Sequence, residues 1–123
     1  MLKGTLLAES LRPGAELRVG GLRLTRLTQQ DFSESVSAAQ PPVWTIIDFE
    51  ADDDTADALA QALARSLLAE GGWYADFRAG DDHVVVFADK IFQYRRGDQA
   101  GRTEAVEYGK TAGVPDHQLD WPD

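Results

Sequence analysis

Three short apolar runs, separated by gaps of turn length, constrain the fold of this chain more than any other feature. The runs are WYADFRA at residues 73–79, HVVVFA at 83–88 and IFQYRR at 91–96. The gaps between them are Gly80-Asp81-Asp82 and Asp89-Lys90. Gaps this short join neighbouring antiparallel strands, whereas parallel strands need a crossover of about a dozen residues or more. We therefore predict a three-stranded antiparallel meander.

The segments before the meander predict a strand and then a helix. The run VWTIIDFE at residues 43–50 has the β-branched and aromatic content of a buried strand. Apolar residues then recur at helical spacing through residues 55–70, and Gly71-Gly72 can end that helix in a left-handed C-cap. Alternation along the strand predicts one face that becomes acidic towards its end, made of Trp44, Ile46, Asp48 and Glu50.

Short strands also open the chain. GTLLAESL at residues 4–11 is typical of a strand that ends at an Arg-Pro-Gly turn. Alternating apolar residues through 17–24 bracket Gly20-Gly21, which predicts a two-residue hairpin. Residues 29–42 are rich in small polar residues and end in two prolines that cannot donate to a sheet, so they form a linker-like segment.

A second helix is expected after the meander. Residues 99–113 follow Asp98, a favourable N-cap residue, and Gly113 stands where the helix should end. In the tail beyond it, Leu119 and Trp121 are expected to attach the end of the chain to the core.

Together these elements predict an α+β fold in one domain, residues 1–123. Opening strands lie in 1–28, the linker-like segment in 29–42 and the main α+β portion in 43–123. The expected order is β-β-β-β-α-β-β-β-α, with a largely antiparallel sheet and both helices packed on one face. At 123 residues, with 43% hydrophobic and 27% charged residues, the chain can form a core without disulfides or a structural metal.

Missing residue types and motifs narrow the function. The chain has no cysteine, which excludes thiol nucleophiles, thiolate zinc sites and iron-sulfur clusters. It contains no G-x-S-x-G nucleophile elbow and neither of the usual glycine-rich phosphate loops. Catalysis is therefore less expected than binding. The first residues lack the long apolar stretch of a signal peptide, and no run is long enough to span a membrane, so a cytoplasmic location is expected.

Charge narrows the choice of partner. The formal net charge is −9 and the pI is about 4.5, which disfavours nucleic acids and anionic membrane surfaces as partners. The chain lacks asparagine, is rich in alanine, aspartate, glycine and arginine, and is poor in lysine. This composition is typical of proteins from GC-rich bacterial genomes.

An acidic stretch between residues 46 and 63 raises the possibility of a metal site. Alternate carboxylates at a strand end could offer oxygen ligands to magnesium or calcium, and a histidine could join them. The EF-hand pattern is not met, because Asp53 stands where that loop requires glycine. The candidate ligands are Asp48, Glu50, Asp52 and His83.

Helix capping is the more common role for such carboxylates. Asp53 or Asp54 could accept a backbone N–H at the start of the helix, and Asp57 would lie in its first turn near the positive end of the helix dipole. This interpretation leaves Asp48 and Glu50 without a role, so these two remain the residues most worth testing.

Two further groups of side chains each allow a functional and a structural interpretation. His83 and His117 could take part in a metal site or an acid-base pair, but an exposed histidine beside a turn is the expected outcome. Basic and aromatic residues of the meander could form a binding patch, or the aromatic residues could face the core. These residues are Arg78, Lys90, Arg95 and Arg96 with Tyr74, Phe92 and Tyr94.

Two functional hypotheses follow. The first is a small acidic interaction domain that binds another protein, or its own copy, without catalysis. Its charge would steer a basic partner towards it. The alternative is a small-ligand-binding protein or a metal-assisted enzyme that uses the acidic cluster at residues 48–54.

Overall fold

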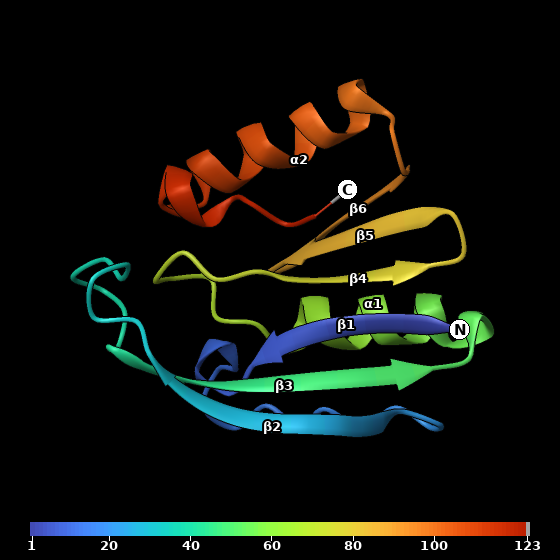
Figure 1. Ribbon diagram of the computed structural model, residues 1–123, viewed down its shortest axis with the longest axis horizontal. Coiled ribbons are helices and arrows are strands. Elements are labelled where there is room, and N and C mark those ends of the chain that lie inside the picture. Colours follow the sequence, from blue (N-terminus) through green and yellow to red (C-terminus); the bar gives the residue numbers. More distant parts are fainter. Residues whose placement is uncertain (123) are drawn as a thin grey trace.

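The computed structural model describes residues 1–122 and confirms the α+β class. Six strands form one sheet in the order β2-β3-β1-β4-β5-β6, and all neighbouring strands are antiparallel (Figure 1). The strands are β1 (Leu2–Leu7), β2 (Arg23–Asp31), β3 (Val43–Ala51), β4 (Ala75–Ala79), β5 (Asp82–Phe87) and β6 (Lys90–Arg95). The helices are α1 (Ala56–Ser66) and α2 (Gln99–Thr111), with short 3-10 turns at Ala8–Ser10, Asp53–Thr55 and Asp116–Gln118. None of the helices in residues 1–122 has the length and apolar character needed to span a membrane.

The meander and the second helix are confirmed. β4, β5 and β6 pair in succession through the two predicted turns. The side chain of Asp98 accepts a hydrogen bond from the Gly101 backbone N–H at 3.1 Å, as expected of an N-cap. Gly113 has φ of 91°, a conformation that favours glycine, and it follows the end of α2. Leu119 and Trp121 are buried, so the end of the chain is attached as expected.

The prediction for the opening strands is wrong in part. Gly20 and Gly21 do form a turn, but residues 15–19 do not pair, and β2 pairs with β3 instead. Leu17, Val19 and Leu22 pack against the core cluster that contains α1. Burial of these apolar side chains takes the place of the hairpin, and the sheet has six strands rather than seven. The linker-like segment is also shorter than predicted, because residues 29–31 belong to β2.

The start of α1 differs from the capping prediction. The residues before the helix form a 3-10 turn, Asp53–Thr55, and neither Asp52 nor Thr55 makes a side-chain cap hydrogen bond. No hydrogen bond from a backbone N–H to the Asp53 or Asp54 side chain occurs within residues 1–122. The helix also ends at Ser66, before the predicted residue 70. Capping by these aspartates is therefore wrong.

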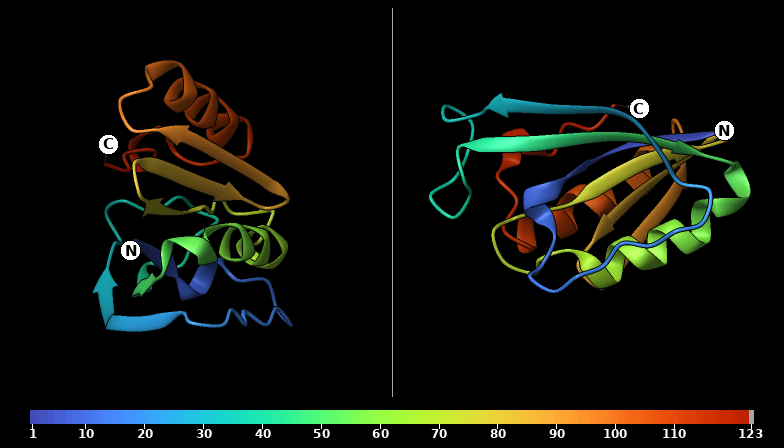
Figure 2. Two further views of the ribbon diagram at one scale, coloured as in Figure 1. Left: turned by 90° about the vertical axis from the view of Figure 1, so that its right-hand side faces the viewer. Right: turned by 90° about the horizontal axis from the view of Figure 1, so that it is seen from below.

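The two helices lie on opposite faces of the sheet, which corrects the prediction that both cover one face. Val84 and Val86 of β5 belong to the core cluster that contains α1. Val85 and Phe87 belong to the cluster that contains Ala105 of α2. Residues Val84, Val85, Val86 and Phe87 of β5 are apolar in unbroken succession, as in strands buried on both faces. Figure 1 shows α1 behind the sheet, and Figure 2 shows the two helices from two further directions.

Candidate functional site

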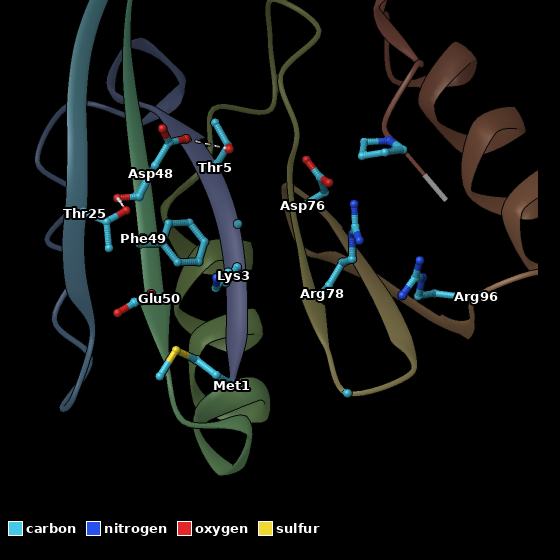
Figure 3. A pocket seen from close by; sticks show the side chains of 13 residues that line it. Met1, Lys3, Thr5, Thr25, Asp48, Phe49, Glu50, Asp76, Arg78 and Arg96 are labelled. Atoms are coloured by element: carbon cyan, nitrogen blue, oxygen red, sulfur yellow. Dashed lines mark hydrogen bonds between the residues drawn. The ribbon is translucent and has the colours of Figure 1, made fainter.

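The sheet face that carries α2 is covered at one end and open at the other. α2 packs over β5 and β6, whereas β1, β3 and β4 are left open on this side and form a groove with a volume of about 760 Å³ (Figure 3). Its side walls carry Asp48 and Glu50 on β3, and Asp76 and Arg78 on β4. The groove is lined by Met1, Lys3, Gly4, Thr5, Thr25, Asp48, Phe49, Glu50, Asp76, Arg78, Gly80, Arg96 and Pro122.

Strand register arranges the groove side chains in rows across the sheet. Lys3 of β1 lies opposite Glu50 of β3 and opposite Arg78 of β4. In the next row, Thr5 lies opposite Asp48 and Asp76. In the third row, Leu7 lies opposite Ile46. Successive rows are two residues apart along the strands, or about 6.6 Å.

The first row brings like charges together. Lys3 and Arg78 are directly opposite, an arrangement that destabilises a sheet, and Arg96 lies at the same end of the groove. Within residues 1–122, none of these three side chains makes an ion pair or a side-chain hydrogen bond. Glu50, the nearby carboxylate of the row, has its carboxylate 3.6 Å from the Arg23 guanidinium. We call Lys3, Arg78 and Arg96 the basic cluster.

The second row holds two carboxylates in fixed positions. The Thr5 hydroxyl donates a hydrogen bond to Asp48 Oδ1 at 3.0 Å, which Figure 3 shows as a dashed line. Asp76 Oδ2 lies 2.9 Å from His83 Nε2. We call Asp48 and Asp76 the acidic pair. Both carboxylates have hydrogen-bond partners that orient them in the groove.

His83 lies beneath the groove and not at the surface. Its side chain is fully buried, with its ring stacked on Tyr94 at a centroid distance of 5.9 Å and with Trp121 at 6.5 Å. Nε2 contacts Asp76, and Nδ1 has no hydrogen-bond partner. The prediction of an exposed histidine is wrong for His83, because His83 shares with Val85 and Phe87 the face of β5 that is covered by α2 and the chain after it; His117 is exposed.

An aromatic compartment adjoins the groove at its third row. It has a volume of about 220 Å³ and is bordered by Phe32, Trp44, Trp73 and Tyr74. The Trp44 ring centroid lies 4.5 Å from Phe32 and 5.5 Å from Trp73. Thr5 and Asp76 line both the compartment and the groove, so the two are continuous along β1 and β4.

The segment after α2 forms the outer wall of the aromatic compartment. Gln118 Nε2 donates to the Ser35 carbonyl at 2.9 Å, and His117 Nε2 lies 2.7 Å from the same oxygen. The Tyr74 hydroxyl donates to the Gln118 carbonyl. Burial raises the pKa of Tyr74, and the nearby carboxylates of Asp76 and Asp120 raise it further. These contacts join two distant parts of the chain into one wall.

The structure separates the four candidate metal ligands. Asp48 and Glu50 lie in the groove, Asp52 lies exposed beyond the end of β3, and His83 is buried beside Asp76. Within residues 1–122, no three histidine, aspartate or glutamate side chains are grouped so that they could hold a metal ion. A metal site at these residues remains a prediction.

The predicted basic and aromatic patch is divided in a similar way. Arg78 and Arg96 belong to the groove, whereas the Lys90 ammonium lies 5.2 Å from the Phe92 ring centroid beside α2. Arg95 is exposed and Tyr94 is buried, as alternation requires.

Two central residues of the groove, Lys3 and Asp76, were not identified from the sequence. Asp76 belongs to a predicted strand and Lys3 immediately precedes another, but only the strand order places them on neighbouring strands. Comparisons with protein-family models, with curated proteins and with solved structures found no match to this chain.

Proposed function

We propose that the protein is a non-catalytic binding domain that takes an extended segment of a partner protein into the groove over β1, β3 and β4. The observation that carries this proposal is the basic cluster. Lys3 and Arg78 occupy directly paired positions on the neighbouring strands β1 and β4, and neither has an ion-pair partner among residues 1–122. In a chain of net charge −9, such an arrangement has a cost in stability, and an anionic group of a partner would relieve it.

The shape of the groove favours an extended segment over a compact ligand. Its volume of about 760 Å³ lies within the range of small-molecule sites. Such sites, however, are mostly apolar and enclose their ligand, whereas charged side chains border this groove and it is open to solvent. The groove follows β1, whose six residues extend about 20 Å. An extended peptide of similar length would match it.

The position of His83 favours binding over acid-base catalysis. A histidine beside a carboxylate could exchange protons with a substrate only if its ring reached that substrate. The His83 side chain is fully buried under Tyr94 and Trp121, and its Nε2 atom contacts Asp76. Its role in this proposal is to hold the Asp76 carboxylate in place.

A peptide library displayed on phage tests the proposal. Selection on the wild-type protein should enrich peptides that bind Arg78→Glu/Arg96→Glu at least about tenfold more weakly, because both changes place negative charge in the basic cluster. The matched control is Arg65→Glu/Arg95→Glu, which changes the net charge equally at two exposed positions outside the groove. The proposal fails if no peptide is enriched, or if the enriched peptides bind both double variants equally well.

A further inference from the structure

The rows of the groove have the same spacing as alternate side chains of an extended chain. In a strand-like peptide, side chains two residues apart point to the same side and lie about 6.6 Å from each other. The basic cluster, the acidic pair and the aromatic compartment follow one another along β1 with this two-residue step, at Lys3, Thr5 and Leu7. A peptide that lies along β1 can therefore place one side chain over each.

We propose that the groove recognises a segment with an acidic residue, a basic residue two positions away and an aromatic residue two positions beyond that, in either chain direction. This inference rests on the proposed function and adds the chemistry of the partner. Each of its three positions follows from a different part of the groove.

The acidic position follows from the basic cluster. Arg78 presents a planar guanidinium that can pair with a carboxylate through two hydrogen bonds, and Lys3 and Arg96 add positive charge at the same end. Figure 3 labels Arg78 and Arg96 among the side chains that line the groove. A carboxylate between these groups would reduce the repulsion between Lys3 and Arg78.

The basic position follows from the acidic pair. Asp48 and Asp76 lie on either side of Thr5. The Thr5 hydroxyl donates a hydrogen bond that orients Asp48, and the His83 Nε2 atom, 2.9 Å from Asp76 Oδ2, orients Asp76. A lysine ammonium above Thr5 would meet negative charge from both sides. The same side chain over the basic cluster would meet three positive groups, and the one carboxylate of that row, Glu50, lies 3.6 Å from Arg23, so the order of the two charged residues in the peptide matters.

The aromatic position follows from the aromatic compartment. Its volume of about 220 Å³ is smaller than the usual range for whole small-molecule ligands and is suited to one large side chain. Trp44, Trp73 and Tyr74 provide aromatic surfaces for stacking, and tyrosine and tryptophan anchors are frequent at the centre of protein interfaces.

Two peptides of identical composition test the order of charges. One contains Glu-Ser-Lys-Ser-Trp and the other Lys-Ser-Glu-Ser-Trp, each with blocked ends and a fluorescent label, and binding is measured by anisotropy at low salt. A reversed peptide, Trp-Ser-Lys-Ser-Glu, covers the second chain direction. We expect the first or the reversed peptide to bind at least about fivefold more tightly than the charge-exchanged one. Equal binding of all three would overturn the inference.

A charge-reversed protein provides the second arm of the test. In Arg78→Glu, the preference between the first two peptides should weaken or reverse, whereas the matched control Arg95→Glu should keep it. If the variant does not fold, the comparison of peptides on the wild-type protein still decides. Failure of all three peptides, while library-selected peptides bind in the groove, would overturn this inference and leave the proposed function intact. Failure of both sets would overturn both.

Discussion

One face of the sheet is divided into two halves that differ in almost every respect. Over β5 and β6, the side chains that point to this face are mostly apolar or aromatic, and α2 and the segment after it cover them. Over β1, β3 and β4, the equivalent positions carry lysine, arginine, aspartate and threonine, and no helix covers them. The covered half contributes stability, whereas the charged side chains of the open half are arranged in a way that stability alone does not favour.

The largest expected effect comes from the covered half. Phe87 is buried and its ring lies 5.1 Å from Tyr108 and 5.9 Å from Tyr74. Phe87→Ala should lower the free energy of unfolding by about 3–5 kcal/mol, because it leaves a cavity beneath α2. Lys3→Ala in the open half should change it by no more than about 1 kcal/mol. Urea denaturation measures both, and similar losses for the two variants would contradict the division.

A smaller effect should appear where α2 approaches the sheet most closely. A Cβ atom at Gly101 would lie 2.5 Å from the Tyr94 Cβ atom. Alanine is favoured over glycine within a helix by about 1 kcal/mol, but overpacking costs about 1–3 kcal/mol. Gly101→Ala should therefore lower the free energy of unfolding by about 1 kcal/mol. If thermal denaturation instead shows a gain in stability, α2 does not lie this close to β6.

The boundary between the halves should be sensitive to high pH. Burial, with Asp76 and Asp120, raises the pKa of Tyr74 in the folded protein above the unfolded value of about 10. Above pH of about 10 the unfolded chain releases a proton that the folded protein keeps, so the free energy of unfolding falls as pH rises. Below that pH the Tyr74 contribution is fully present.

Replacement of Tyr74 isolates this contribution. Tyr74→Phe should cost about 1 kcal/mol at neutral pH, because the hydrogen bond to the Gln118 carbonyl is lost. It should also make the decline in stability above pH of about 10 shallower than in the wild type. Urea denaturation at several pH values measures the decline, with Tyr108→Phe as the control. Identical pH dependence in Tyr74→Phe and the wild type would show that this phenol is not held neutral.

The smallest effect, and the most informative one, has the opposite sign. Arg78→Gln removes one of two like charges at directly paired strand positions, the other being Lys3, so it should raise the free energy of unfolding by a few tenths to about 1 kcal/mol while it weakens peptide binding. The gain should shrink in about 1 M salt, because screening already weakens the repulsion. Arg95→Gln is the control outside the groove. A loss of stability in Arg78→Gln would mean that Arg78 serves the fold.

Strands with a clear local pattern were predicted correctly from the sequence. The predictions failed where tertiary packing determined which segments pair. The meander and the Asp98 cap are local patterns, and both are present. The hairpin at Gly20-Gly21 was equally regular, but its apolar residues pack against the core instead. The failure at α1 has a similar cause, because a 3-10 turn at Asp53–Thr55 leads into the helix in place of a side-chain cap.

The candidate site was predicted only in part. Alternation correctly placed Trp44, Asp48 and Glu50 along one face of β3, where they now border the groove or its aromatic compartment. Their neighbours Lys3 and Asp76 lie far away in the sequence. They come close to β3 because the strand order places β1 between β3 and β4. Nothing in the local sequence specifies that order, so the rows of charge could not be predicted.

The central claim is that a partner segment occupies the open half of this sheet face and leaves the covered half undisturbed. The three tryptophans provide direct probes, since Trp44 and Trp73 border the aromatic compartment whereas the Trp121 indole donates to the Tyr94 hydroxyl at 2.6 Å beneath the covered half. We would titrate ¹⁵N-labelled protein with the Glu-Ser-Lys-Ser-Trp peptide, and with its reversed form, and follow the three indole N–H signals by NMR. The account predicts that the Trp44 and Trp73 signals shift with increasing peptide while the Trp121 signal stays in place. A shift confined to Trp121, or no shift of any indole signal when anisotropy shows that the peptide is fully bound, would contradict it.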